Sequence, residues 1–340
     1  PKLVRMADIA QKLSVSTVTV SKALNDKPGV SEEVREKIKE TALQMGYKAP
    51  SPLKAARFGL ATGNIGVIIP SRFLDSYSFY WAMYQNLLSH LREREYYGVL
   101  EILTDDEELE SSPPRMLVDG KVDGLILIGQ LEECYLEMLR AADIPLMFLD
   151  SYNGKSGGSS IISDGYYGMY AVVSYLINMG HRNIYFVGRL DATSSINDRY
   201  YGYSRAMNEN GLRTADYMVI PDRDENGNLS IVLPDTLPSA FACNCDLTAY
   251  ELTGLLKQRG LSVPNDISVA GFDDFIGLSG PRSLDITTYA VDINAMTKAA
   301  VDNLFQKMID KDYRPTLKVI TGRLIIKDSV RAIQHPNIIV

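Results

Sequence analysis

From residue 65 onward, short apolar runs of the chain alternate with longer amphipathic stretches. Short continuous apolar strands that alternate with helices indicate parallel sheets covered by helices on both faces. Nine such strands are many for one ordinary sheet, so the pattern predicts two α/β lobes. The expected strands are 65–70, 98–103, 122–128, 145–149, 160–163, 184–188, 216–220, 239–243 and 267–272, and the expected helices are 80–95, 132–142, 165–180, 200–211 and 247–260.

The first sixty residues carry a charge opposite to that of the rest of the chain. They hold eleven Lys and Arg against six Asp and Glu, whereas the whole chain has 35 basic and 42 acidic residues and a net charge of −7. A basic head on an acidic body is typical of a nucleic-acid-binding module attached to a second domain.

Three short helical patterns occupy this basic head. Residues 6–13 place apolar side chains at helical spacing, residues 16–24 follow after a minimal turn, and Ser31 is a good N-cap for a third helix. Helices joined by so short a turn match helix-turn-helix geometry, in which the second helix presents its N-terminal residues to the major groove. A structural three-helix cap with a solvated basic face is the alternative interpretation.

The stretch "VSTVTVSKAL" (15–24) is rich in β-branched residues, and local propensity therefore favours a strand there. In the helical interpretation, Ser16 is the N-cap, and the residues that face inward are Val15, Val20, Ala23 and Leu24. The outward side chains are then Thr17, Val18, Ser21 and Lys22. Methyl groups of Thr and Val can contact the thymine methyl group, and a lysine can contact phosphate or guanine.

The head resembles the N-terminus of the lactose-repressor (LacI/GalR) family throughout. The resemblance lies in Asp8-Ile9-Ala10, Val15-Ser16, the run Thr19 to Asn25, Val30-Ser31, Val34-Arg35 and Met45-Gly46-Tyr47. It continues over nearly the whole chain, through "IGVIIP" (65–70), "VDGLILIG" (122–129), "PLMFLD" (145–150), "MGHRNIYFVG" (179–188), "DRYYGY" (198–203), the long segment 246–274 and "SLDITTY" (283–289).

The resemblance implies an all-α helix-turn-helix headpiece at 1–48, a hinge at 49–63 and an effector-binding and dimerisation domain at 64–340. The last domain is expected to be a periplasmic-binding-protein-like α/β body with parallel sheets. Its first lobe would cover about 64–162 and 292–320, and its second lobe about 163–291 and 321–332. The DNA contacts implied are Arg5, Met6, Ser16, Thr17, Val18, Ser21, Lys22, Asn25, Ser31 and Leu53.

Three positions depart from the family pattern within the DNA-binding part. Lys22 stands where Arg is usual, and it keeps the charge but loses the bidentate fork. Ser14 replaces the common turn glycine. The hinge segment "KAARFGL" (54–60) replaces the usual A-R-x-L. The family inserts a wedge residue from its hinge into the minor groove. Leu53, Phe58 and Leu60 are all candidates for that residue here.

Candidate effector-binding residues lie at the ends of the expected strands, where open α/β sheets bind ligands. Carboxylates, a guanidinium and stacking aromatic rings suit a ligand with several hydroxyl groups, such as a sugar. Cys245-Asp246 replaces the family's usual Asn-Asp pair, and Asn244 would point to the other side of an extended strand. The candidates are Asp150, Asp246 and Asp273 at strand ends, Arg199 opening the helix after 184–188, and the paired aromatics Phe79 and Tyr80.

The expected function is a transcriptional repressor that binds palindromic operator DNA as a homodimer under control of a small-molecule effector, most simply a sugar. A nucleobase or phosphosugar ligand, a sugar-transport module and a sugar-modifying enzyme are the alternatives. We expect no catalytic constellation, no metal and no cofactor: the loop 222–233 begins like a calcium loop but has Leu233 at position 12. The absence of a signal peptide or long apolar run in this sequence predicts a cytoplasmic protein without a membrane span.

Overall fold

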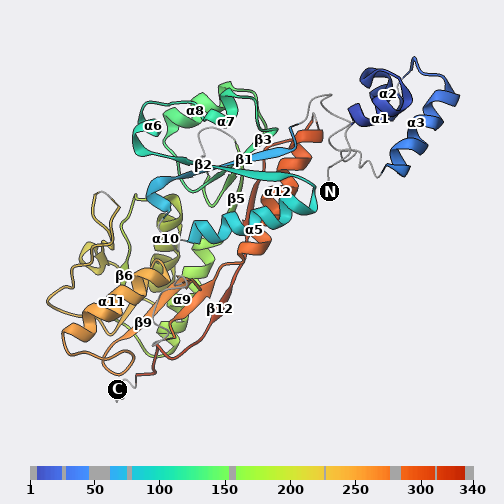
Figure 1. Cartoon of the computed structure of the whole chain (residues 1–340). Helices are drawn as coiled ribbons and strands as arrows, with labels where there is room; N and C mark the ends of the chain where they lie inside the picture. Colours follow the sequence, from blue (N-terminus) through green and yellow to red (C-terminus); the bar gives the residue numbers. More distant parts are fainter. Residues whose placement is uncertain are drawn as a thin grey trace. The chain divides into compact units, whose positions relative to one another are not determined.

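The computed structural model describes residues 6–24, 28–45, 62–74, 79–152, 158–225, 227–275, 285–310 and 312–333. The chain divides into two compact units, Pro1–Gly63 and Asn64–Val340. We describe each unit by itself (Figure 1). No helix within the described ranges is both long and apolar enough to cross a membrane.

The first unit contains the three expected helices: α1 (Met6–Leu13), α2 (Thr17–Leu24) and α3 (Glu32–Gln44). One buried cluster joins them, and it takes two residues from each helix: Ile9 and Ala10, Val20 and Ala23, and Ile38 and Ala42. The β-branched stretch is therefore a helix, because burial of Val20 and Ala23 against both neighbouring helices outweighs the local strand propensity.

The second unit consists of two lobes, each built around a six-stranded sheet. In lobe 1 the strand order is β11-β5-β4-β3-β1-β2, and all neighbours are parallel. The strands are β1 (Asn64–Pro70), β2 (Tyr97–Leu103), β3 (Gly124–Ile128), β4 (Leu146–Leu149), β5 (Ser159–Ser163) and β11 (Leu317–Ile320). The helices are η1 (Ser71–Phe73), α5 (Phe79–Glu93), α6 (Asp105–Leu109), α7 (Arg115–Val118), α8 (Glu133–Ala141) and α12 (Ile293–Ile309).

In lobe 2 the strand order is β12-β10-β9-β8-β6-β7, and only the edge strand β12 runs antiparallel to its neighbour among the described pairings. The strands are β6 (Ile184–Val187), β7 (Val219–Ile220), β8 (Ala240–Cys243), β9 (Ser268–Asp273), β10 (Thr287–Ala290) and β12 (Arg323–Ile325). The helices are α9 (Gly165–Asn178), α10 (Ser194–Glu209), η2 (Asp216–Met218) and α11 (Asp246–Gln258).

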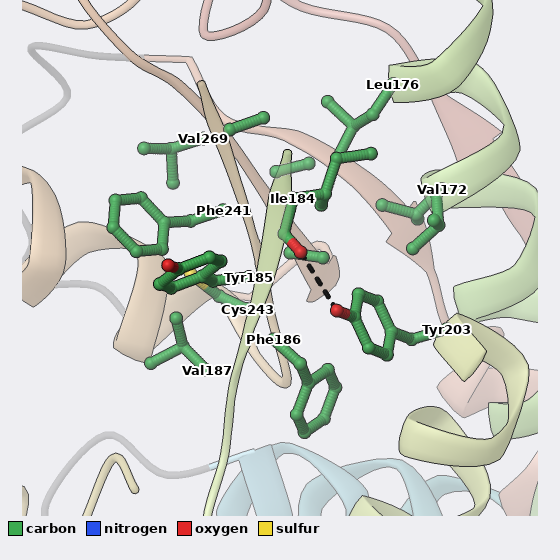
Figure 2. Packing of buried hydrophobic residues seen from close by; sticks show 14 of the residues in the cluster. Val172, Leu176, Ile184, Tyr185, Phe186, Val187, Tyr203, Phe241, Cys243 and Val269 are labelled. Atoms are coloured by element: carbon green, nitrogen blue, oxygen red, sulfur yellow. Dashed lines mark hydrogen bonds between the residues drawn. The ribbon is translucent and has the colours of Figure 1, made fainter. Parts of the chain in front are cut away.

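The core of lobe 2 lies between this sheet and its helices. Figure 2 shows Val172 and Leu176 of α9 facing Ile184 of β6, with Phe241 and Val269 from the neighbouring strands. Tyr203 of α10 is fully buried, and its hydroxyl donates to the carbonyl oxygen of Ile184 at 2.9 Å. This bond satisfies a buried polar group and fixes α10 against the first strand of the lobe.

The chain passes between the lobes three times: from β5 to α9, from β10 to α12, and from β11 to β12. The backbone N–H of Asp164 in the first crossing donates to the carbonyl oxygen of Ile320 in the third at 3.0 Å. The fold class expected from the sequence is thus confirmed, with a helical head and a two-lobed α/β body.

Several element predictions were wrong in detail. The segment 216–220 is a 3-10 turn followed by a two-residue strand, and the strand β10 and the short helices α6 and α7 were not expected. These are short edge or rim elements, whose local hydrophobic period is weak. Helix α10 begins at Ser194 instead of 200, because the Thr193 hydroxyl accepts from the Ile196 N–H and caps it.

Candidate functional site

The recognition helix α2 starts with a side-chain cap. The Ser16 oxygen accepts from the backbone N–H of Thr19 at 3.0 Å and lies 2.8 Å from the Thr19 hydroxyl. Ser14, just before it, adopts a φ of 54°, the left-handed conformation that ends α1. The backbone therefore turns where the family usually has glycine, even though this chain has serine there.

The side chains at the start of α2 are accessible. Val18 is 62% exposed, so its methyl groups are accessible to a binding partner. Thr17, Lys22, Ser16 and Ser31 are also exposed, and Ser21 is half-buried. Met6 begins α1. The predicted contacts Arg5, Asn25 and Leu53 lie outside the described residues, as does the hinge up to residue 61.

Two residues of the head differ from expectation. Ser31 occupies the N-cap position of α3, but its side chain makes no capping hydrogen bond. Arg35 was part of the family resemblance but was assigned no structural role; it is buried, and its guanidinium donates to the carbonyl oxygens of Lys22, Ala23 and Val30, each at 3.4 Å. Arg35 thereby satisfies the last carbonyls of the recognition helix. A lone Arg in an amphipathic helix carries no signal of such burial.

In the body, three of the predicted effector residues form a buried charged group. The Tyr80 hydroxyl donates to Asp150 at 3.0 Å, and Ser163 donates to the other Asp150 oxygen at 3.4 Å. Arg199 of lobe 2 is 6% exposed, and its charge opposes the rise in the Asp150 pKa that burial causes. Burial and then the neighbouring carboxylate also raise the pKa of Tyr80, which keeps its hydroxyl protonated.

Arg199 lies in the second turn of α10 and does not open the helix as expected. Its guanidinium lies 4.2 Å above the Phe272 ring and donates to the Asn244 carbonyl oxygen at 2.8 Å. Its Nε has no hydrogen-bond partner among the residues that the structure describes. A buried donor without a partner costs free energy, and a ligand oxygen would satisfy it.

Asp273 ends β9, Asp246 is the first residue of α11 after the neighbouring strand β8, and the two lie close together. The backbone N–H of Phe275 donates to both carboxyl groups, at 3.2 Å and 3.0 Å. Burial raises the pKa of Asp246 well above its ordinary value, and the Asp273 charge adds to this. Burial also raises the pKa of Asp273, against the opposing charge of Arg199. Two close buried carboxyl groups thus retain protons that exposed ones would lose.

Asn244 is not part of this group. Its amide donates to Asp222 at 2.7 Å, and the Thr248 hydroxyl and the Arg223 guanidinium also donate to Asp222. Burial raises the pKa of Asp222, but the hydrogen bonds and charge of Arg223 outweigh it and hold the pKa below its ordinary value. The start of the calcium-like loop is therefore a buried ion pair, which fixes the segment after β7 to α11.

Aromatic rings link the two lobes beside the charged group. Phe79 and Tyr80 lie with ring centroids 5.8 Å apart, and Phe73 packs on Tyr80 at 5.2 Å. Phe79 of lobe 1 meets Phe275 of lobe 2 edge to face, with centroids 6.0 Å apart. No sequence pattern marks Phe275 as a site residue, because it follows Asp273 and Asp274 in an irregular segment.

A cavity of about 830 Å3 opens between the lobes next to these rings. We call it the outer cavity. Lobe 1 contributes Arg72, Phe73 and the α6 region, and lobe 2 contributes Arg189 and the segments around 191 and 224. Among the described residues that line it are seven carboxylates against three guanidinium groups. The carboxylates are those of Asp105, Asp106, Glu108, Glu132, Asp191, Asp224 and Glu225.

One side-chain hydrogen bond joins a residue of lobe 1 to a residue of lobe 2. The Gln130 side-chain oxygen, in the loop after β3, accepts from the backbone N–H of Ser194 at 2.9 Å. Ser194 is the first residue of α10, the helix that carries Arg199. Gln130 was not among the predicted residues, since a lone loop glutamine is ordinarily solvated.

Comparison with known proteins agrees with this architecture. Residues 5–50 match the family described as bacterial regulatory proteins, lacI family, and residues 173–330 match the periplasmic binding protein-like domain. The chain is 29% identical over 335 residues to the HTH-type transcriptional repressor PurR of Vibrio atlanticus (strain LGP32), covering 96% of this chain and 98% of that protein.

Two solved structures share the fold. The lac repressor dimer bound to operator and the anti-inducer ONPF has a TM-score of 0.73 at 21% identity, covering 97% of this chain and all of that one. The complex of the transcriptional regulator CelR with cellobiose has a TM-score of 0.68 at 20% identity, covering 96% and 99% of the two chains.

Proposed function

The chain belongs to the lacI family of bacterial regulatory proteins, and from this premise we propose how it reads DNA and what controls it. It is a DNA-binding transcriptional regulator with an effector-binding domain, and not an enzyme. Its relatives include repressors. We take repression of transcription in the bacterial cytoplasm as its role.

In this proposal residues 1–48 bind the operator, and 49–63 link them to the body. Thr17 and Val18 read base edges, and Lys22 contacts phosphate or guanine. The observation that carries the assignment is the exposed start of α2, where Val18 is 62% exposed. An apolar side chain in that position suits contact with a thymine methyl group.

Replacing both reading residues tests this assignment. The Thr17→Ala, Val18→Ala double variant should bind its best operator about tenfold more weakly, because it loses apolar base contacts, and should change its base preference. Operator selection from random duplexes followed by anisotropy titration at fixed salt would measure both. Leu43→Ala is the matched control, since Leu43 is an 82% exposed apolar residue on α3. Unchanged base preference in the double variant would refute the assignment.

The proposed effector is a sugar bound between the lobes. Asp150, Arg199, Asp246 and Asp273 supply hydrogen-bonding groups, and Phe79 and Tyr80 supply rings that can stack on a pyranose. The buried group of Tyr80, Asp150 and Arg199 carries this proposal, since it converges from two lobes. The similarity to a cellobiose complex supports a sugar as the ligand class.

A thermal-shift screen of mono- and oligosaccharides, nucleobases and sugar phosphates would identify the effector. We expect Arg199→Ala and Asp273→Ala each to abolish the shift, whereas Arg182→Ala, at an exposed position before β6, should keep it. Operator binding by the same variants shows that they are folded. If the shift survives both cleft substitutions, the site lies elsewhere.

We propose that the protein acts as a homodimer on a palindromic operator. One helix-turn-helix reads only a half-site, and two-fold symmetry in the protein matches a palindrome. The lac repressor neighbour is a dimer on its operator, which supports the same arrangement. Sedimentation velocity at micromolar concentration should show a dimer, and a stable monomer there would contradict the proposal.

A further inference from the structure

The outer cavity has a strongly acidic wall. Its seven carboxylates come from both lobes, and five of them belong to exposed residues: Asp105, Asp106, Glu132, Asp191 and Glu225. Three guanidinium groups face seven carboxylates among the described lining residues. Clustered charge of one sign between low-dielectric walls focuses the potential into the opening.

Two of the three arginines on this wall are already bound to carboxylates. Arg72 pairs with the buried Glu108 and with Asp105, the latter at 3.0 Å. Arg223 pairs with the fully buried Asp222 at 2.7 Å. The charge of a guanidinium in such a pair is already compensated by its carboxylate partner, so it adds little net positive charge to the wall.

The outer cavity adjoins the proposed effector site. Phe73 and Arg223 line the outer cavity, and both also act on Tyr80: the Phe73 ring packs against it, and the Arg223 charge opposes the rise in its pKa. Tyr80 in turn bonds Asp150. A ligand that enters through the outer cavity therefore passes the acidic wall before it reaches the buried group.

The buried group suits hydroxyl groups. The Arg199 charge opposes the rise in the pKa of Asp150 and Asp273, and the Lys327 charge opposes that of Asp246. Carboxyl groups that retain protons can donate as well as accept hydrogen bonds, as the hydroxyl groups of an uncharged sugar do. Selectivity against anions therefore rests on the outer cavity, where seven carboxylates face three guanidinium groups among the described lining residues.

We propose that this cleft selects an uncharged or cationic sugar and rejects phosphorylated and acidic sugars. The proposal deepens the sugar-effector function proposed above and rests on it for the identity of the site. It also separates this chain from the phosphosugar alternative that the sequence left open. Arg189 is the only cavity-lining arginine outside these ion pairs, and the charge of one guanidinium does not balance the wall.

Cys134 allows the charge of the cavity to be tested without knowing the effector. It is a free, exposed cysteine on the cavity wall. Burial raises the pKa of Cys243 well above its ordinary value and that of Cys245 to about 11, so these thiols react slowly near neutral pH. The Cys134 thiolate attacks a disulfide reagent, forms a mixed disulfide and releases the reagent's other half as a thiolate.

The rate of this reaction should depend on the charge of the reagent. The rate constant of Cys134 with each reagent is divided by that of 2-mercaptoethanol with the same reagent, which removes the reagents' intrinsic reactivity. At low salt, this ratio should be about tenfold lower for anionic 5,5′-dithiobis(2-nitrobenzoate) than for neutral 4,4′-dithiodipyridine. The difference should shrink at about 1 M KCl, where the Debye length is only about 3 Å. Cys134→Ser should remove the fast phase and so identify it.

Matched charge variants locate the effect. Asp106→Asn with Glu225→Gln removes two carboxylates from the cavity and should bring the two rates closer together by several-fold. Asp216→Asn with Glu251→Gln removes the same charge from exposed positions outside the cavity lining. This control variant should keep the difference between the rates with the anionic and the neutral reagent. Equal rates for the anionic and neutral reagents in the unmodified protein would overturn the proposal.

Sugars provide the second arm. Glucose and cellobiose are the neutral probes, and glucose 6-phosphate and fructose 1,6-bisphosphate are the anionic ones, each measured by thermal shift with the intact chain. A shift with a neutral sugar that is absent with the anionic ones supports the proposal. A larger shift with an anionic sugar overturns it. If no sugar binds but Cys134 still reacts more slowly with the anionic reagent, the proposed sugar effector is wrong, whereas the exclusion of anions from the outer cavity is supported.

Discussion

Asp273 shows most clearly how single residues of the cleft are constrained. Its φ is 92°, and Asp150 and Asp274 also have positive φ, at 60° and 56°. For a residue with a side chain, such conformations cost of order 1–3 kcal/mol each, and they cluster at functional sites. The backbone is therefore held in unfavourable conformations at the strand ends where the predicted effector residues lie. No local sequence rule predicts this, although Asp tolerates it better than most residues.

The raised pKa of Asp273 makes stability depend on pH. The folded protein keeps this proton at pH values where the unfolded chain, with an ordinary pKa of about 3.9, has lost it. Rising pH therefore favours unfolding from about pH 4 up to the folded pKa. Asp273→Asn should remove this dependence. The free energy of unfolding of the variant minus that of the unmodified protein should therefore increase between about pH 5 and pH 7, by at most about 1.4 kcal/mol per pH unit.

Urea unfolding at several pH values, followed by circular dichroism, measures this difference. The exposed Asp235→Asn variant is the control and should show no pH-dependent gain. A stability difference for Asp273→Asn that stays constant with pH would mean that Asp273 is ionised in the folded protein across this range.

Among the elements, α10 links the most parts of the body. Its N-terminal N–H bonds Gln130 of the other lobe, its second turn carries Arg199, and Tyr203 anchors it to β6. Gly202 lets it approach α9 closely, since a Cβ there would lie 3.0 Å from the Tyr170 nitrogen. A ligand bound at Arg199 and the contact between lobes at Gln130 thus act on one rigid helix.

Gln130→Ala should weaken effector binding through this helix. The substitution removes one hydrogen bond between the lobes, and a typical net value of about 0.5–1.5 kcal/mol corresponds to an effector Kd that is roughly two- to tenfold higher. Isothermal titration with the sugar found by the screen measures the change. Gln130→Glu keeps an acceptor oxygen at the helix N-terminus, where negative charge is favourable, and should restore most of the affinity. Equal affinity in all three proteins would exclude a role for this contact.

At the scale of the whole molecule, the three crossings make the two lobes a pair whose arrangement a ligand can bias. An effector shifts the equilibrium between two arrangements of the lobes only as far as its affinities for the two arrangements differ. The three-helix head is a compact unit separate from this two-lobed body.

This coupling should be reciprocal. If the effector changes operator affinity by some factor, operator DNA must change effector affinity by the same factor, which is typically about 5- to 150-fold. Effector titrations with and without saturating operator, set against operator titrations with and without effector, measure the two factors. Unequal factors at equilibrium would show that the two ligands bind different oligomeric forms.

Much of the architecture was open to prediction because its signals are local. Buried strands such as β1 and β3 are continuous apolar runs, and helices such as α5 and α9 have clear amphipathic periods. The short helices α6 and α7 escaped prediction, because they are too short for a period to show. The strand-end carboxylates could be named as candidates because parallel sheets place such residues at one edge.

The sequence by itself determined the class of this protein: a basic three-helix head, a body with two α/β lobes, and acids and an arginine after the strands. Tertiary structure alone decided that Arg199 acts on both Asp150 and Asp273, that Gln130 bridges the lobes and that Arg35 bonds the last carbonyl groups of α2. The reason is physical. Secondary structure follows from neighbours along the chain, whereas charge pairing, burial and pKa depend on residues up to a hundred or more positions away.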